Sequence, residues 1–203
     1  MSTKIVSDTT TSTIQVNGVD AVVIGSTGIE SGYADGSIHQ AALAEKPTTM
    51  TPVTVSTPVA NIDFSAIPSW VKKIVVILTG ATTTTHGKID ARIGDAGGLE
   101  VTGYVGKLNE SGASVASVTD SIPIIGVQRS GVVVTEASFI MELFNTDGNT
   151  WAYKMTSSSG GSGNIAGYSE GYKTLSAALT QLSVYVQSGG MFTVGTMTLR
   201  YEL

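Results

Sequence analysis

The chain has 203 residues, no cysteine, and a net charge of −5 with only 13% charged residues. The lack of cysteine excludes disulfides, thiolate metal sites and cysteine nucleophiles, so packing or contacts with other subunits must hold the fold. The only adjacent basic residues are Lys72 and Lys73. Because no basic stripe is present, nucleic-acid binding is not expected.

Hydropathy and composition narrow the class of protein further. The N-terminus has no apolar core of signal-peptide length, and the longest apolar run, 74–78, is far shorter than the roughly 20 residues of a membrane span. We therefore expect a soluble protein, made in the cytoplasm, without membrane insertion. Abundant Gly, Ser and Thr with few charges are typical of strands and turns, which predicts an all-β fold.

Residues 1–58 have the composition of an extended N-terminal arm or connector. Within them, 13–24 forms two β-rich runs around an Asn-Gly dipeptide, which suits the positive φ angles of a tight hairpin. The Ala-rich stretch 37–46 has room for a short helix, but Pro47 ends it and the Pro-Thr pattern that follows favours extended chain. We expect 1–58 to serve attachment or trimerisation and 59–203 to form one β-sandwich domain.

From residue 59 the sequence alternates short β-rich runs with turn signals at the spacing of a β-sandwich. Two aromatic-bearing runs flank the Gly-containing loop 145–149, which predicts a hairpin, whereas the Ser- and Gly-rich segment 157–163 predicts a mobile surface loop. The last strand is expected inside a sheet, with Phe192 on one face and Met197 and Leu199 on the other. The expected strands are 59–64, 71–79, 88–94, 99–107, 113–118, 131–143, 150–156, 181–187 and 191–202.

Three blocks stand out in this part of the chain: IDFSAIPSWVKKIVVIL at 62–78, IGDAGGLEVTGY at 93–104, and YKTLSAALTQLSVYVQSGGMFTVGTMTLRYE at 172–202. In order and spacing they resemble the jelly-roll-like β-sandwich domain of tail fibres and minor structural proteins of tailed bacteriophages. In those proteins the Pro-Ser-Trp corner opens the sandwich, the Gly-rich acidic turn joins two central strands, and the Lys-Thr-Leu-Ser piece begins the closing strands. The resemblance covers most of 59–203.

The resemblance implies a non-enzymatic structural protein on the virion surface, commonly a homotrimer, with the sandwich facing outward and the arm bound to phage capsid or tail proteins. Since the chain has hardly any shaft, a capsid decoration protein (cement or head fibre), a short tail-fibre component and an adaptor all stay open. The alternative from another class is an adhesion module of the virion that binds a host surface glycan. A third hypothesis is a hydrolase built around Ser169.

That third hypothesis depends on a G-x-S-x-G pattern at 167–171, which contains Ser169. In hydrolases the pattern exposes the serine at a strand-to-helix turn, and an acid and a histidine follow later in the chain. Both histidines, His39 and His86, precede Ser169, so we interpret 167–171 as a Gly- and Ser-rich turn. Neither histidine has a second one at ligand spacing, and each is expected at the surface.

Asp90, Asp95 and Glu100 are carboxylates close in sequence, and paired carboxylates are what a glycosidase requires. Asp90 and Arg92 alternate with apolar neighbours, so the simpler interpretation is the solvated face of a strand with a weak ion pair.

Asn145, Asp147 and Asn149 stand at alternate positions, as calcium ligands do in the first turn of an EF-hand loop. However, Gly148 is at the fourth place rather than the sixth, and Thr156 takes the place of the bidentate Glu. A simple turn explains all three polar residues. We expect no catalytic residue, no metal site and no cofactor.

Trp151 and Tyr153 project from the same face of the expected strand 150–156. With Tyr104 they are candidates for an aromatic platform on which a host glycan stacks. Core packing or a contact between subunits is the alternative for the same three residues.

Overall fold

The computed structural model describes residues 3–7, 12–16, 19–25, 28–32, 47–84, 88–110, 116–125, 134–160 and 165–203. The chain divides into two compact units, Met1–Lys46 and Pro47–Glu202. Every element of the described residues is a strand, and every pairing between them is antiparallel, which confirms the all-β class. No helix capable of crossing a membrane is found in this described part of the chain.

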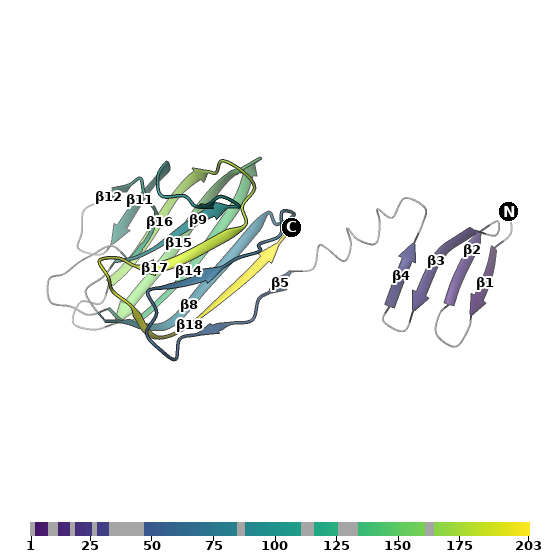
Figure 1. Ribbon diagram of the computed structural model, residues 1–203, viewed down its shortest axis with the longest axis horizontal. Coiled ribbons are helices and arrows are strands. Elements are labelled where there is room, and N and C mark those ends of the chain that lie inside the picture. The colour runs from purple at the N-terminus through teal and green to yellow at the C-terminus, as the bar shows by residue number, and fades with distance from the viewer. Residues whose placement is uncertain are drawn as a thin grey trace. The chain divides into compact units, whose positions relative to one another are not determined.

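The first unit contains a four-stranded antiparallel sheet, drawn in purple in Figure 1. Four described strands between residues 3 and 32 thus form a sheet where the sequence predicts an extended arm with one hairpin. That hairpin is confirmed, with Val16 opposite Val19, while the Ala-rich stretch 37–46 lies outside the described residues. The strands pair in chain order: β1 (Thr3–Ser7), β2 (Ser12–Val16), β3 (Val19–Gly25) and β4 (Gly28–Gly32).

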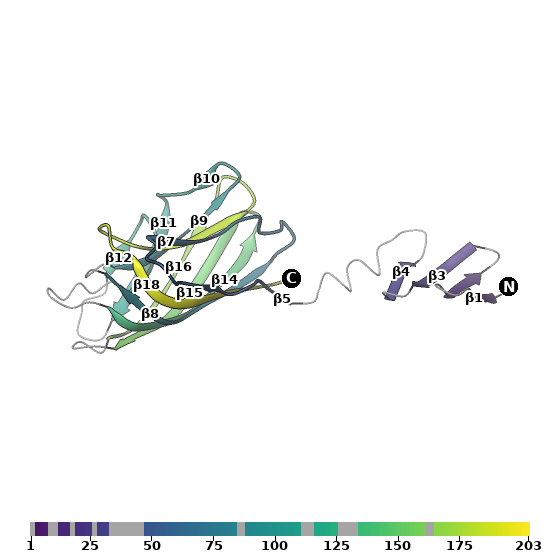
Figure 2. The ribbon, with the colours of Figure 1, turned by 60° about the horizontal axis from the view of Figure 1, so that its bottom comes forward.

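The second unit is a sandwich of two sheets, whose layers separate in Figure 2. The large sheet has the order β12-β11-β16-β15-β14-β8-β18-β5, with β6 also on β18, and the small sheet has the order β10-β9-β17-β7, with β13 on β9. The strands are β5 (Thr48–Thr49), β6 (Val53–Thr54), β7 (Asn61–Phe64), β8 (Lys73–Thr83), β9 (Ile89–Asp95), β10 (Gly98–Leu99), β11 (Tyr104–Glu110), β12 (Ala116–Val118), β13 (Ile122–Ile125), β14 (Thr135–Asp147), β15 (Thr150–Gly160), β16 (Ile165–Thr174), β17 (Gln181–Val186) and β18 (Phe192–Glu202).

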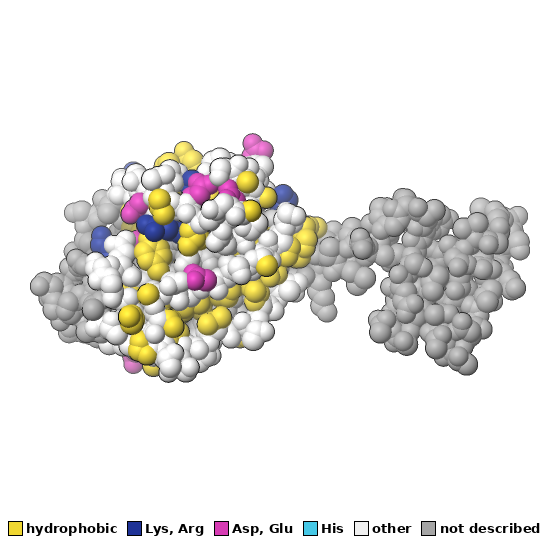
Figure 3. All heavy atoms as spheres, viewed as in Figure 1, with side chains coloured by type: hydrophobic (Ala, Val, Ile, Leu, Met, Phe, Trp, Pro, Cys, Tyr) yellow, Lys and Arg dark blue, Asp and Glu magenta, His cyan; other side chains and the backbone are white. Residues whose placement is uncertain are grey.

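The core lies between the two sheets, because alternate residues of each strand face inward. In β8, Ile74, Val76 and Leu78 are fully buried, whereas Ile77 is 37% exposed on the outer face. Acidic and basic side chains are interspersed on the face of the sandwich shown in Figure 3. The inward residues of the other strands complete the core and include Ile62, Phe64, Ile89, Ile93, Tyr104, Phe139, Met141, Leu143, Val184, Met197 and Leu199.

The C-terminal strand β18 is paired on both sides, as expected, but a bulge breaks its alternation. The register with β8 shifts twice between Phe192 and Thr196, where Gly195 has a φ of 131° and lies against Ala81. The bulge turns Phe192 into the same core as Met197. The prediction that Phe192 and Met197 face opposite sides is therefore wrong.

The loop predicted at 157–163 is wrong for its first four residues, because β15 continues to Gly160. Ser157 and Ser159 are buried, and the Ser157 hydroxyl donates a 2.8 Å hydrogen bond to the carbonyl of Ile124 in β13. Serine thus occupies inward positions here because a main-chain carbonyl of the opposite layer satisfies its hydroxyl.

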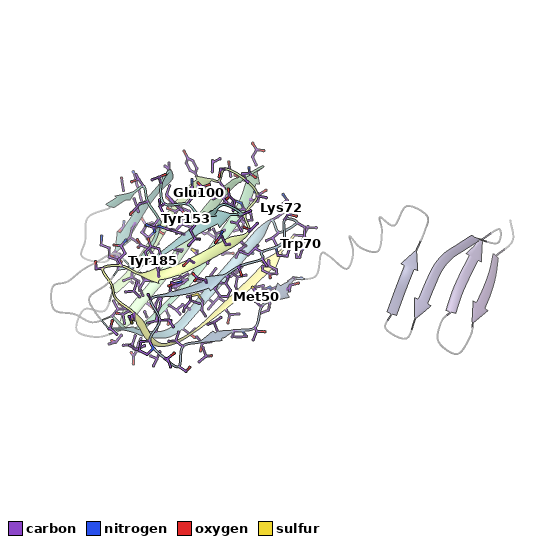
Figure 4. All side chains as sticks on the ribbon, in the orientation of Figure 1. Met50, Trp70, Lys72, Glu100, Tyr153 and Tyr185 are labelled. Carbon is purple, nitrogen blue, oxygen red and sulfur yellow. The ribbon has the colours of Figure 1, made fainter. Side chains whose placement is uncertain are left out.

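The sandwich begins at Pro47, earlier than the expected boundary between residues 58 and 59. The short strands β5 and β6 pair with β18, and Val55 is buried in the core. The Pro-Ser-Trp corner is a turn in which the Val71 amide donates to the carbonyl of Pro68. The Trp70 ring packs edge-on against Tyr201, and Figure 4 shows it at the right-hand end of the sandwich.

Candidate functional site

Ser169, the centre of the G-x-S-x-G pattern, lies within β16, between β11 and β15 of the large sheet. Its side chain is 1% exposed, and its hydroxyl donates a 2.8 Å hydrogen bond to the carbonyl of Pro123 in β13. The predicted turn is therefore wrong, since this segment is a central strand. With its proton engaged by a carbonyl rather than by a base, Ser169 is arranged to hold β13 and not to attack a substrate.

Two of the three sequence blocks meet at one rim of the sandwich, where Figure 4 shows Glu100. Glu100 forms an ion pair with Lys173. The Ser176 hydroxyl bridges Asp95 Oδ2 and Glu100 Oε1 at 2.6 and 2.9 Å, and the Ser176 amide donates to Glu100 at 2.7 Å. We call Asp95, Glu100, Lys173 and Ser176 the rim clasp. It ties the end of β9 and the turn before β11 to the end of β16 and the segment before β17.

The Gly-rich turn that carries the two carboxylates is fixed by close main-chain contacts. A Cβ atom at Gly94 would lie 2.1 Å from the carbonyl oxygen of Gly98, so no larger residue fits there. Tyr104 closes the turn, because its hydroxyl accepts from the Ile93 amide at 2.9 Å and lies 3.1 Å from the carbonyl of Glu100. The residue types of this block therefore follow from the shape of the turn.

The electrostatics of the rim clasp keep both carboxylates charged. The hydrogen bond from Lys173 holds the pKa of Glu100 below its usual value, and the hydrogen bond from Ser176 does the same to the pKa of Asp95. A glycosidase needs one carboxyl group with a raised pKa as its acid. The structure brings Asp95 and Glu100 together, but with both pKa values shifted the other way.

Asp90 lies apart from the rim clasp and is only 2% exposed, so the expected solvated position is wrong. Its carboxylate accepts hydrogen bonds from Ser121 at 2.8 Å and from Gln187. Burial nevertheless raises the pKa of Asp90 to about 6. Arg92 forms no ion pair with it among the described residues; its guanidinium lies over the Tyr185 ring, 4.8 Å from the centroid.

Trp151, Tyr153 and Tyr104 are 4%, 3% and 1% exposed. All three rings pack in the core of the sandwich, and Figure 4 shows Tyr153 there. A sugar ring needs an exposed aromatic face, so the arrangement offers no glycan platform at these residues. A second subunit likewise has no access to the three rings.

The position of the Tyr153 side chain explains why two neighbouring strands each have a glycine beside it. Gly171 is its register partner in β16, and Gly106 is the partner of Gly171 in β11. A Cβ atom would lie 1.7 Å from the Tyr153 hydroxyl oxygen at Gly106 and 2.6 Å from it at Gly171. The tyrosine thus lies beneath both glycines on the inner side of the sheet, and its hydroxyl has no hydrogen-bond partner among the described residues.

The hairpin predicted around 145–149 is confirmed as β14 and β15. The Asn145 side-chain amide donates to the carbonyls of Gly148 and Thr150 at 2.7 and 3.3 Å, so Asn145 serves the turn. Within the described ranges no three His, Asp or Glu side chains are grouped to hold a metal ion. His39 and His86 lie outside these ranges.

A hollow of about 670 Å³ opens over β11, β12, β15 and β16 on the outer face of the large sheet. One wall is the cross-strand row Val105, Tyr172 and Ala152, and the other contains the register partners Lys107 and Glu170. We call this hollow the sheet groove. Gly106 and Gly171 lie between the walls, and Tyr104 and Tyr153 also line the hollow. β12 with the residue after it adds Ser117, Val118 and Thr119.

Of the residues that line the sheet groove, Tyr104 and Tyr153 were candidates from the sequence, whereas Tyr172, Glu170 and Lys107 were not. The signal was present in the alternation of Tyr168, Glu170 and Tyr172 with smaller residues, which places these three on one outer face once 165–174 is a strand. Interpreting 167–171 as a turn hid that pattern.

No protein-family model, curated protein or solved structure matches the chain.

Proposed function

We propose that the chain is a non-enzymatic structural protein on the surface of a tailed-phage particle, as a capsid decoration protein or a short tail-fibre component. The sandwich is the displayed part, with the jelly-roll-like character of the phage domain, and three chains associate. The N-terminal unit contributes attachment or trimer contacts.

One observation carries this proposal: Ser169, Asp95 and Glu100, which the sequence offered as candidate catalytic side chains, are engaged in holding the fold. Ser169 binds the carbonyl of Pro123, and Asp95 and Glu100 share Ser176 in the rim clasp. Catalytic groups must instead be positioned to meet a substrate. A mechanical role needs only stable packing and burial of apolar surface between subunits, at roughly 25 cal/mol per Å².

The rim clasp also supports the resemblance on physical grounds. The blocks 93–104 and 172–202, which are far apart in the chain, supply its two halves. The two blocks that resemble the phage domain therefore depend on each other structurally in this chain, because each supplies half of the rim clasp.

The division of the chain into two units is a further support. Residues 1–46 and 47–202 each form their own compact set of contacts, which suits a protein with one part for attachment and another for display.

Particles released from cells that carry the gene test the proposal directly. Immunogold labelling with an antibody against the full chain is expected to decorate intact particles, and native mass spectrometry of the purified protein is expected to give three times the 20.9 kDa chain mass. Unlabelled particles would refute the virion location, and a monomer at micromolar concentration would refute the trimer.

A further inference from the structure

We infer that the sheet groove binds a short, uncharged oligosaccharide. The inference goes beyond the proposed function and does not depend on it, because it follows from the shape and the side chains of the groove. Its ligand contacts come from Tyr172, Glu170 and Lys107.

The size of the groove suits a ligand of a few sugar rings. Its volume of about 670 Å³ lies in the range of small-molecule sites, roughly 300–1,000 Å³. It lies on the outer face of a sheet, so a chain of sugars can rest in it while both ends continue into solvent.

Tyr172 provides the aromatic surface. It is 47% exposed, and its register neighbours in the same wall are Val105, which is 49% exposed, and Ala152. The small side chain of Ala152 leaves space beside the phenol ring. An exposed tyrosine offers a large apolar face with a polar tip, which matches a pyranose with one apolar face and a rim of hydroxyls.

Glu170 and Lys107 provide the polar contacts. They stand opposite each other in β16 and β11, yet neither forms an ion pair within the described residues. The carboxylate accepts and the ammonium donates hydrogen bonds, so together they match neighbouring sugar hydroxyls, which do both. Ser117 and Thr119 add exposed hydroxyls at the β12 side.

The charges of the groove favour an uncharged ligand. One carboxylate and one ammonium line the walls, so the net charge of the lining is zero. A phosphate, sulfate or nucleic acid needs an excess of positive charge, which this groove does not have.

The part of the groove between its walls is held from inside. The Tyr153 ring packs beneath Gly106 and Gly171, and the two strands approach so closely that a Cβ atom at Gly171 would lie 2.1 Å from the Val105 carbonyl oxygen. A preformed groove lowers the ordering cost of binding.

The test uses the full chain on an array with glucose-, galactose- and mannose-terminated oligosaccharides beside sialylated and sulfated ones. We expect binding to uncharged members, and isothermal titration with the best uncharged trisaccharide then measures affinity. Tyr172→Ala and Glu170→Gln are each expected to weaken binding about tenfold or more, and Tyr172→Phe to change it less than about threefold.

Tyr168→Ala is the matched control, because Tyr168 lies on the same strand and face, is 53% exposed, and stands outside the groove. Its affinity is expected to equal that of the unchanged protein, and thermal unfolding checks that all variants fold. Binding of acidic glycans alone, no signal on the uncharged set, or an equal loss in Tyr168→Ala would each overturn the inference. Failure of particle labelling together with a positive array would refute only the virion location.

Discussion

Two lysine–glutamate combinations behave in opposite ways: Lys173 of β16 with Glu100, which lies between β10 and β11, and Lys107 of β11 with Glu170 of β16. Lys173 is 4% exposed, and its ammonium contacts Glu100, the Thr174 carbonyl at 2.9 Å and the Tyr104 ring, with the centroid at 5.5 Å. Lys107 and Glu170 are exposed register partners that form no ion pair within the described residues.

The difference follows from the side of the sheet on which each charge lies. A charge that leaves water must gain partners that compensate for its lost hydration, and Lys173 does so in the rim clasp. An outward charge stays hydrated and gains little from pairing. The charged residues of the rim clasp are therefore part of the fold, whereas those of the sheet groove are available to a ligand.

The largest expected effect comes from Lys173→Met. Removal of the ammonium leaves the half-buried Glu100 carboxylate without its cation, and we expect a loss of about 3 kcal/mol in the free energy of unfolding. Urea denaturation measures it. The matched variant Lys107→Met in the sheet groove is expected to change stability by less than about 0.5 kcal/mol. Equal losses at the two lysines would contradict the comparison.

Asp90 extends the comparison, because it is buried and forms no ion pair among the described residues. Its pKa is 3.8 ordinarily and about 6 in the folded chain, so between these values the unfolded chain releases its proton first and stability falls as the pH rises. This loss, on the order of 3 kcal/mol, persists above pH 6, and Asp90→Asn is expected to remove it.

Urea unfolding of Asp90→Asn and of the unchanged protein between pH 4 and 7 measures the slope. Glu100 serves as the internal contrast: its lowered pKa gives stability that is present at neutral pH and lost on acidification. If stability still falls with rising pH in Asp90→Asn as it does in the unchanged protein, another group is responsible for that fall.

Smaller effects are expected from the buried hydroxyls. Ser169→Ala and Ser157→Ala each leave a β13 carbonyl without its hydrogen bond and are expected to cost about 1 kcal/mol. The exposed neighbour Ser158→Ala is the control, with less than about 0.5 kcal/mol expected. Fluorophosphonate labelling of the unchanged protein is expected to give no adduct, and an adduct at Ser169 would revive the hydrolase hypothesis.

The smallest effect is expected where an ion pair lies on the outer face. Lys154 pairs with Glu142 at 2.8 Å, but its side chain is 63% exposed. Lys154→Gln is expected to change stability by less than about 0.5 kcal/mol, measured by the same urea titration. A loss as large as that of Lys173→Met would show that pairing, rather than burial, decides the contribution.

The alternation of apolar and polar residues was sufficient to predict those strands in which every inward residue is apolar. β8 and the hairpin of β14 and β15 follow from alternating apolar residues and one turn glycine. β16 could not be predicted this way, because its Gly167, Ser169 and Gly171 have local preferences for turns. Only contacts with Tyr153 and Pro123, from other strands, make these residues suitable for a central strand.

The residues of the rim clasp likewise divide into those that could be predicted from the sequence and those that could not. The nearness of Asp95 and Glu100 could be predicted, since they lie in one turn. Their partners Lys173 and Ser176 could not, because they are brought there by the sandwich. The outward position of Tyr172 could not be predicted either, because it depends on β16 being a strand, and the sequence of β16 favours a turn.

Several strands at the borders of the two sheets of the sandwich are short. The large sheet ends in β12, with three residues, and in β5 and β6, with two each, and β10 at one border of the small sheet also has two. Such borders offer few free amides and carbonyls to a neighbouring molecule. At these borders, the sandwiches of crowded copies therefore have little means of joining strand to strand into amyloid-like fibrils, even at very high local concentration.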